Sequence, residues 1–137
     1  MLRGIAHSAV RVADVDAAVA WYRDVLGMTV LSPPYRMEGD EITRDMGELV
    51  PAPVVVKAAI VGFDGGDDRV LEVIEYPGVG CAPAEPPSVT GLGVTHVGLV
   101  CDDVAGLRTT WFADPWANVF ILVEKARRPD RPYYRQF

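Results

Sequence analysis

The chain has 137 residues, of which 50% are hydrophobic and 23% are charged. This length suits one hydrophobic core and leaves no room for a second, and the composition excludes a disordered tail, a fibrous repeat and a disulfide miniprotein. The net charge of −6 is unevenly spread: residues 1–124 hold eight basic and eighteen acidic side chains, whereas residues 125–137 hold five basic and one acidic. An acidic body repels a phosphate backbone, so we expect no nucleic-acid partner.

The composition also bears on the compartment. No apolar run approaches the roughly 18 residues that cross a bilayer, and the N-terminal residues lack the pattern of a signal peptide. We therefore expect a soluble, cytoplasmic protein without a membrane partner. Two cysteines, Cys81 and Cys101, are too few for a disulfide framework, and a reducing compartment would keep both as thiols.

The first part of the chain predicts a strand, a helix, a second strand and a polar flap. Alternation places His7 and Ala9 on one face of the first strand. Asp14 is a natural helix N-cap, and Gly27 supplies the left-handed stop. The expected elements are a strand over residues 3–12, a helix over 15–26, a strand over 28–32 that ends at Pro33–Pro34, and an irregular flap that runs to Pro53.

The rest of the chain predicts further strands and one linker. Two β-rich runs flank five turn-forming residues, which indicates a hairpin, and the second run places Val70, Glu72, Ile74 and Tyr76 on one face. Four prolines and four glycines over residues 77–93 indicate a linker. The expected strands are 54–63, 69–76, 94–101, 107–113 and 118–125, followed by a basic tail over 126–137.

The sequence contains an internal repeat. The segment from His7 to Val15 aligns without gaps with the segment from His96 to Val104, so that the two histidines and an Asp-Val pair fall in register. A second ungapped match relates residues 70–76 to residues 119–125. Two copies of one unit would be related by an approximate twofold axis, which would bring His7 and His96 face to face.

These motifs resemble the vicinal oxygen chelate superfamily, which includes glyoxalase I, methylmalonyl-CoA epimerase, extradiol dioxygenases, fosfomycin resistance proteins and bleomycin-binding proteins. The resemblance covers residues 4–125 and rests on the run from His7 to Gly27, the Leu71–Glu72 strand, the His96 strand and the Asp114–Pro115 turn. It implies an α+β fold in which two βαβββ modules form a curved mixed sheet around a central cavity. Module one would span residues 3–76 and module two residues 94–125, within a single domain.

The resemblance implies a metal site. His7 and His96 would be the ligands from the first strand of each module, and Glu72 the ligand from the last strand of module one. Position 121 should supply a fourth ligand but holds Ile121, and Ala117 replaces a glycine of the family's turn motif. Two imidazoles and one carboxylate are in any case a set that holds a divalent ion and leaves positions open for substrate. We expect Fe, Zn, Mn, Ni or Co.

Other residues are weaker candidates. Tyr35, Trp111 and Ile121 are expected to contact a substrate, and Trp116 is a further aromatic candidate, although aromatic residues in β-rich domains are usually core. Glu75 and Glu124 lie on the strand face opposite the ligand positions, so we expect surface or salt-bridged carboxylates. The acidic residues of the flap either line the mouth of the site or are simply solvated; they are Asp40, Glu41, Asp45 and Glu48.

Module two is short. His7 and Glu72 are 65 positions apart, whereas His96 and Ile121 are only 25 apart, and no helix-forming segment follows Val104. The helix and second strand of this module are therefore expected to be absent, unless this sequence lacks a stretch of the expressed protein. Their loss would uncover a sheet face and an edge, which predicts a homodimer in which a second subunit covers them and the basic tail clasps its acidic surface.

Two main functions follow from these residues. The first is a metal-dependent enzyme that acts on a small oxygen-rich substrate by isomerisation, lyase chemistry or oxygenation, with no general base assigned. The second is a metal-free protein that sequesters an antibiotic or metabolite, which Ile121 favours. A scaffold without any ligand is a third interpretation. The absence of a phosphate-binding glycine loop and of a nucleophile-His-acid triad in the sequence argues against nucleotide-dependent and serine-hydrolase chemistry.

Overall fold

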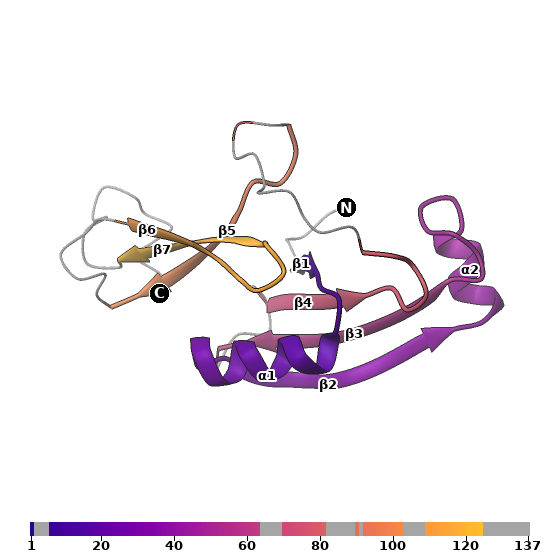
Figure 1. The fold of residues 1–137 in the computed structure, drawn as a ribbon, viewed down its shortest axis with the longest axis horizontal. Coiled ribbons are helices and arrows are strands. Elements are labelled where there is room, and N and C mark those ends of the chain that lie inside the picture. The colour runs from indigo at the N-terminus through magenta and orange to yellow at the C-terminus, as the bar shows by residue number, and fades with distance from the viewer. Residues whose placement is uncertain (2–5, 64–69, 82–89, 91, 103–108, 125–137) are drawn as a thin grey trace. The chain divides into compact units, whose positions relative to one another are not determined.

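The structure is a computed structural model that describes residues 1, 6–63, 70–81, 90, 92–102 and 109–124. The chain divides into two compact units, Met1–Ala82 and Pro83–Phe137, and each is described by itself (Figure 1). Three expected features lie outside the described residues: the hairpin turn over 64–68, most of the 77–93 linker and the basic tail. No helix in the described residues is long and apolar enough to cross a membrane.

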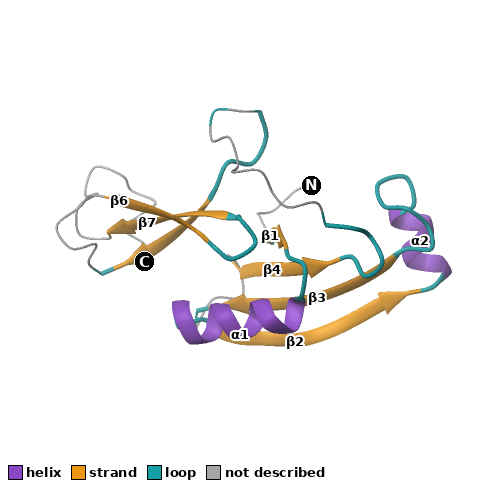
Figure 2. Cartoon of the chain, viewed as in Figure 1, coloured by secondary structure: helices purple, strands orange, loops and turns teal. Residues whose placement is uncertain are grey.

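The first unit is a four-stranded mixed sheet with two helices (Figure 2). The strand order is β1-β4-β3-β2, in which β1 and β4 run parallel and the other neighbours run antiparallel. The adjacent antiparallel β3 and β4 confirm the two strands of the predicted hairpin. The elements are β1 (His7–Arg11), α1 (Val15–Leu26), β2 (Thr29–Glu38), α2 (Asp40–Met46), β3 (Val55–Gly62) and β4 (Val70–Glu75).

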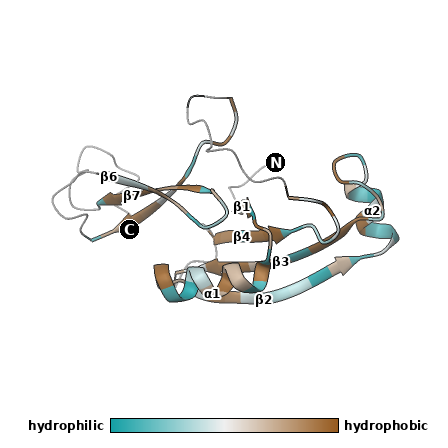
Figure 3. Cartoon of the chain, viewed as in Figure 1, coloured by the Kyte–Doolittle hydropathy of each residue, from teal (hydrophilic) through white to brown (hydrophobic). Residues whose placement is uncertain are grey.

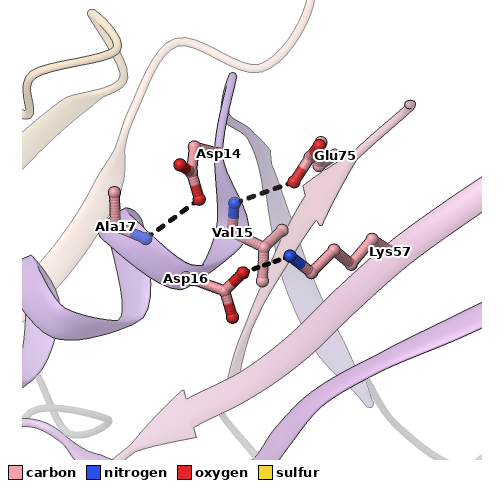
Figure 4. A network of polar contacts seen from close by, with 6 residues as sticks. All are labelled: Asp14, Val15, Asp16, Ala17, Lys57 and Glu75. Atoms are coloured by element: carbon pink, nitrogen blue, oxygen red, sulfur yellow. Dashed lines mark hydrogen bonds and ion pairs between the residues drawn. The ribbon is translucent and has the colours of Figure 1, made fainter. Parts of the chain in front are cut away.

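Helix α1 has the bounds that the sequence predicts, because both of its ends are fixed locally. The Asp14 side chain accepts a hydrogen bond from the Ala17 backbone N–H at 3.1 Å, and Gly27 ends the helix with φ of 68°. The Glu75 carboxylate adds a tertiary contact, since it accepts from the Val15 N–H at 3.0 Å (Figure 4). Asp16 also pairs with Lys57 of β3.

One face of the sheet packs against α1 and forms the main core. Helix α1 contributes side chains at helical spacing, and strands β3 and β4 contribute the side chains of their odd-numbered residues. Burial of these aliphatic groups supplies the main driving force for folding of this unit. The buried residues on this face are Val10, Val15, Ala18, Val19, Tyr22, Ala59, Val61, Leu71 and Val73.

Strand β2 is longer than expected, because Pro33 and Pro34 lie within it rather than ending it. The strand is at the edge of the sheet, so one side of its backbone needs no hydrogen-bond donors. The register of β2 against β3 shifts between Val30 and Ser32 and again between Ser32 and Tyr35, which accommodates the two prolines.

The expected flap contains the helix α2, which corrects the prediction of an irregular segment. Residues of this helix and the segment after it pack on the sheet face opposite α1 and form a second small core. The Thr43 hydroxyl also accepts from the Val54 N–H at 3.2 Å. Figure 3 shows hydrophobic residues gathered in β3 and β4, whereas α2 is largely hydrophilic. The second core contains Met37, Ile42, Met46, Val50, Val54, Val56, Ala58, Ile74, Tyr76 and Val79.

The second unit is a three-stranded sheet. Its strands are β5 (Val97–Cys101), β6 (Thr109–Ala113) and β7 (Val119–Glu124), in the order β5-β7-β6. Strands β5 and β7 run parallel, and β6 and β7 run antiparallel. His96 lies directly before β5, which corrects the expected strand over 94–101. Phe120 is fully buried, and its ring stacks on that of Phe112 at 5.3 Å.

The strand registers match the internal repeat. In the first unit Ala9 and Ile60 both pair with Glu72, and in the second Gly98 and Trp111 both pair with Ile121. Strand β5 therefore corresponds to β1, β7 to β4 and β6 to β3. The strand order and the parallel and antiparallel pairings are the same in both units. Position 121 is thus the structural counterpart of position 72.

The second module is shortened, as expected, within an α+β fold. Only residues 102–108 separate β5 from β6, which is fewer than the twelve residues of α1 alone. The segment therefore has no room for counterparts of both α1 and β2. Glu124, the counterpart of Glu75, is only 7% exposed, which excludes the surface alternative of the prediction for Glu124 and leaves the salt-bridged one open.

The hairpin between β6 and β7 holds Ala117 in a conformation that favours glycine. Ala117 has φ of 67°, and the backbone of Asp114 donates to the Asn118 carbonyl and accepts from the Ala117 N–H, each at 3.0 Å. These contacts define a three-residue loop in which the residue before the second strand is left-handed and is usually glycine. An alanine there is strained by its Cβ atom.

We expect Ala117→Gly to raise the free energy of unfolding by about 0.5–1 kcal/mol, because relief of the strain exceeds the added flexibility of the unfolded chain. Urea denaturation followed by circular dichroism measures this change. Ala20→Gly, inside α1, is the matched control and should lower stability by about 1 kcal/mol. A loss of stability in Ala117→Gly would show that the loop is not strained at this position.

Candidate functional site

The candidate site of the first unit lies on the sheet face opposite α1. Pairing of Ala9 with Glu72 and of Glu72 with Ile60 places these side chains in one row across three strands. His7 lies two residues before Ala9 and therefore shares the face. The second small core covers another part of this face, around Ala58 and Ile74.

The structure brings two predicted ligands together. His7 Nε2 and Glu72 Oε2 are 3.2 Å apart, and their side chains are 48% and 16% exposed. The parallel pairing of β1 with β4 produces this contact, because it sets the two side chains diagonally opposite each other. The imidazole remains open to solvent while the carboxylate is largely enclosed.

The separation of these two atoms fits a shared metal ion. Two donor atoms about 2.1 Å from one ion lie about 3.0 Å apart at a right angle and about 3.4 Å apart at the tetrahedral angle. The observed 3.2 Å falls between these values and is long for a charge-assisted hydrogen bond. Among the described residues, no group of three or more His, Cys, Asp or Glu side chains forms a complete metal site.

Tyr35 lies on the same face, and the charge of Glu72 affects the pKa of its phenol. Tyr35 pairs with Ala58 and Ala58 with Ile74, so the small alanine side chain separates the phenol from β4. Partial burial raises the pKa of the Tyr35 phenol above its usual value, and the negative charge of Glu72 raises it further. The phenol therefore stays protonated, and able to donate a hydrogen bond, throughout the neutral range.

The second unit gathers the other three predicted site residues. The rings of His96 and Trp111 meet edge to face with centroids 4.8 Å apart, and Ile121 lies between Gly98 and Trp111 in the sheet. His96 Nδ1 is 2.8 Å from the Thr95 hydroxyl oxygen. When Nδ1 carries the proton and donates to Thr95, Nε2 keeps its lone pair for a metal ion.

The remaining candidates lie in structural positions. Trp116 is half-buried in the loop between β6 and β7, where its backbone N–H donates to Asp114. Asp40 and Glu41 are exposed in the first turn of α2, where negative charge favours the helix. Asp45 and Glu48 are exposed as well, in agreement with the solvated interpretation of the acidic segment.

Arg11 is a residue of this face that the sequence analysis missed. It follows His7 by four positions on β1, so strand alternation alone could have identified it. Its guanidinium lies over the Tyr76 ring at 5.5 Å and donates to the carbonyls of Val79 and Gly80 at 3.4 Å. Arg11 thereby connects β1 to the segment that follows β4.

Comparison with known proteins identifies the family. The sequence profile of the Glyoxalase/Bleomycin resistance protein/Dioxygenase superfamily matches residues 4–113. The chain belongs to this superfamily. The chain is also similar to the uncharacterized protein YwbC of Bacillus subtilis strain 168, with 30% identity over 106 residues, which are 77% of this chain and 66% of YwbC.

Solved structures of the superfamily share the fold. A glyoxalase family protein from Bacillus cereus has a TM-score of 0.71 at 15% identity, covering 90% of this chain and 94% of that one. The trypanothione-dependent glyoxalase I of Leishmania major has a TM-score of 0.64 at 17% identity, covering 98% of this chain and 96% of that one. At sequence identities this low, the similarity to these two structures shows a shared fold and nothing further.

Proposed function

We propose that this superfamily member is a metal-dependent enzyme acting on a small oxygen-rich substrate, by isomerisation, lyase chemistry or oxygenation. The observation that carries the proposal is the 3.2 Å separation of His7 Nε2 and Glu72 Oε2 on a sheet face that the main helix leaves open. An imidazole nitrogen and a carboxylate oxygen are donors that Fe, Zn, Mn, Ni and Co all accept.

The proposed ligand set is His7, Glu72 and His96. His96 occupies the position in module two that His7 occupies in module one, and its contact with Thr95 suits a ligand held in one tautomer. When bound, a divalent ion would polarise a carbonyl or enolate oxygen of the substrate or hold oxygen beside it. Three protein ligands leave coordination positions open for that substrate.

Other side chains of this chain would bind and orient the substrate. Tyr35 offers a protonated phenol beside Glu72, which suits a hydrogen bond to a substrate oxygen. Trp111 and Ile121 present apolar surfaces on the His96 face of the second unit, and Trp111 is 51% exposed. We propose these three residues as substrate contacts and assign no general base.

A metal-free binding protein for an antibiotic or metabolite is the second candidate. It is favoured by Ile121, which replaces a carboxylate with an aliphatic side chain at the counterpart of Glu72. An apolar group in that position suits packing against an organic ligand better than coordination. The two candidates differ in one measurable property, the metal content of the protein.

The test is the metal content of protein purified without chelators or added metal, measured by inductively coupled plasma mass spectrometry. We expect about one divalent ion per chain in the wild type and less than about a tenth of that in His7→Ala. Loss of the imidazole removes a donor that backbone or water cannot replace with equal affinity.

Glu75→Gln is the matched control, because Glu75 lies on the same strand as Glu72 but points to the opposite face. Its metal content should equal that of the wild type. A wild type that contains no metal and shows no change in melting temperature with divalent ions would overturn the enzyme proposal. Binding of an organic ligand would then support the second candidate, and binding of none would leave a scaffold.

The expected homodimer also belongs to this proposal, because the second module lacks room for two elements that the first module contains. The basic residues after Glu124 would meet the acidic body of a second copy.

A further inference from the structure

The two units hold their histidines in different ways. In the first unit His7 Nε2 lies 3.2 Å from Glu72 Oε2, so a carboxylate on the neighbouring strand orients the imidazole. In the second unit Ile121 occupies the position that corresponds to Glu72, and its side chain has no polar atom. A contact of the first kind is therefore impossible between His96 and residue 121.

Two other residues contact the His96 imidazole. The Trp111 ring meets it edge to face, with centroids 4.8 Å apart and planes at 73°. The Thr95 hydroxyl oxygen lies 2.8 Å from Nδ1. The ring contact limits the tilt of the imidazole, and the hydroxyl contact limits its rotation about the Cβ–Cγ bond. His96 is exposed, but these contacts favour one orientation, with Nδ1 directed at Thr95 and Nε2 on the other side of the ring.

The counterpart of Trp111 in the first unit is an aliphatic residue. Trp111 pairs with Ile121 in the way that Ile60 pairs with Glu72, so Ile60 occupies the corresponding place. Strand β7 lies between β5 and β6, which sets the backbones of β5 and β6 about 10 Å apart. An indole is long enough to reach an imidazole across that distance, whereas an isoleucine side chain is too short.

The counterpart of Thr95 also lacks the group that makes the contact. The repeat aligns His7 with His96, so Ala6 corresponds to Thr95, and alanine has no hydroxyl. The unit that lacks the carboxylate is therefore the one that has a ring and a hydroxyl beside its histidine. This distribution indicates that the two contacts do for His96 what Glu72 does for His7.

We propose that Trp111 is a positioning residue for the metal site, because its indole holds the His96 imidazole in the orientation that leaves Nε2 available to the ion. The inference rests on the proposed function, in which His96 is a ligand. Trp111 acts through His96 and needs no contact with the ion, so this role is separate from its proposed contact with substrate. A side chain that is ordered before binding loses less entropy on binding, so a held imidazole binds an ion more tightly than a free one.

Nuclear magnetic resonance of the metal-free protein tests the orientation by itself. The chain has two histidines, so the spectrum of His7→Ala identifies the ring protons of His96. We expect nuclear Overhauser effects between these protons and those of the Trp111 indole. The His96 ring signals should also move in Trp111→Leu, because the ring current of the indole is lost. Absence of both effects would overturn the positioning role, whether or not the protein binds metal.

Titration of metal-depleted protein with Zn²⁺ or Ni²⁺ by isothermal calorimetry tests the consequence for binding. Trp111→Leu should bind the ion about 10-fold more weakly than the wild type, because the imidazole is no longer held. Trp111→Phe keeps an aromatic ring at this position and should stay within about 3-fold of the wild type. Because Trp111 is exposed, neither variant should change the circular dichroism of the chain.

Trp21→Leu is the matched control, because it makes the same change on helix α1, which lies on the sheet face opposite Glu72. Its metal affinity should equal that of the wild type. A Trp111→Leu variant that binds metal as tightly as the wild type would overturn the positioning role alone. A Trp111→Phe variant as weak as Trp111→Leu would also overturn it, since an aromatic ring would then not suffice. A wild type that binds neither ion would instead overturn the proposed function, and the role of Trp111 with it.

Discussion

Replacing Ile121 with Glu is expected to raise the affinity for a divalent ion by about 100-fold, which corresponds to about 2.7 kcal/mol. Ile121 is the counterpart of Glu72 by strand register, and it lies on the same sheet face as Trp111 and Gly98. A carboxylate in this position would add a fourth ligand and a negative charge to the proposed set of two histidines and one glutamate.

Titration of metal-depleted protein with Zn²⁺ or Ni²⁺ by isothermal calorimetry measures this change. Without metal, Ile121→Glu should melt below the wild type, because Ile121 is half-buried and a charge is costly there. Added metal should then raise its melting temperature more than that of the wild type.

Leu122→Glu is the control, since it introduces the same charge one residue along, on the opposite face of β7. Its metal affinity should equal that of the wild type. Equal affinity in Ile121→Glu and the wild type would show that position 121 does not contribute to the site.

Replacing Asp114 with Ala is expected to lower the free energy of unfolding by about 3 kcal/mol. The Asp114 side chain belongs to a residue that is only 5% exposed, and its Oδ1 atom accepts from the backbone N–H groups of Trp116 and Asn118 at 2.9 and 2.8 Å. Oδ2 accepts from the Asn118 side-chain amide at 2.8 Å. Alanine would leave these donors without that acceptor inside the loop.

Urea denaturation followed by circular dichroism measures the loss. Asp114→Asn keeps one acceptor oxygen and should lose roughly half as much stability. Asp45→Ala removes an exposed carboxylate of α2 and should change stability by less than about 0.5 kcal/mol. If Asp114→Ala were as stable as Asp45→Ala, the carboxylate would not hold the loop together.

The structural features that the sequence predicts correctly are those that depend on residues close together in the chain. The bounds of α1 follow from Asp14 and Gly27, which act on the backbone within one turn. The shared face of His7 and Glu72 follows from alternation along β1 and β4. The internal repeat identified position 121 as the counterpart of Glu72, and the strand registers agree with that match.

The errors concern residues whose structure depends on distant parts of the chain. Pro33 and Pro34 would interrupt a central strand, but β2 lies at an edge and its register against β3 shifts around the two prolines. Helix α2 has only seven residues, too few to be stable by local propensity. It packs against residues of β2, β3 and β4 on the sheet face opposite α1. Of the two alternatives predicted for Glu124, a surface or a salt-bridged carboxylate, its burial excludes the first.

The sequence by itself determined the α+β fold, its superfamily, the repeat and the residue types of the proposed ligand set, because strand alternation, helix capping and matched spacing are properties of adjacent residues. Only the tertiary structure decided that His7 Nε2 and Glu72 Oε2 lie 3.2 Å apart, since that distance comes from the parallel pairing of strands 65 positions apart in the chain. It also decided that Ile121 lies between Gly98 and Trp111 in the second unit's sheet, because strand pairing joins residues that are distant in the chain.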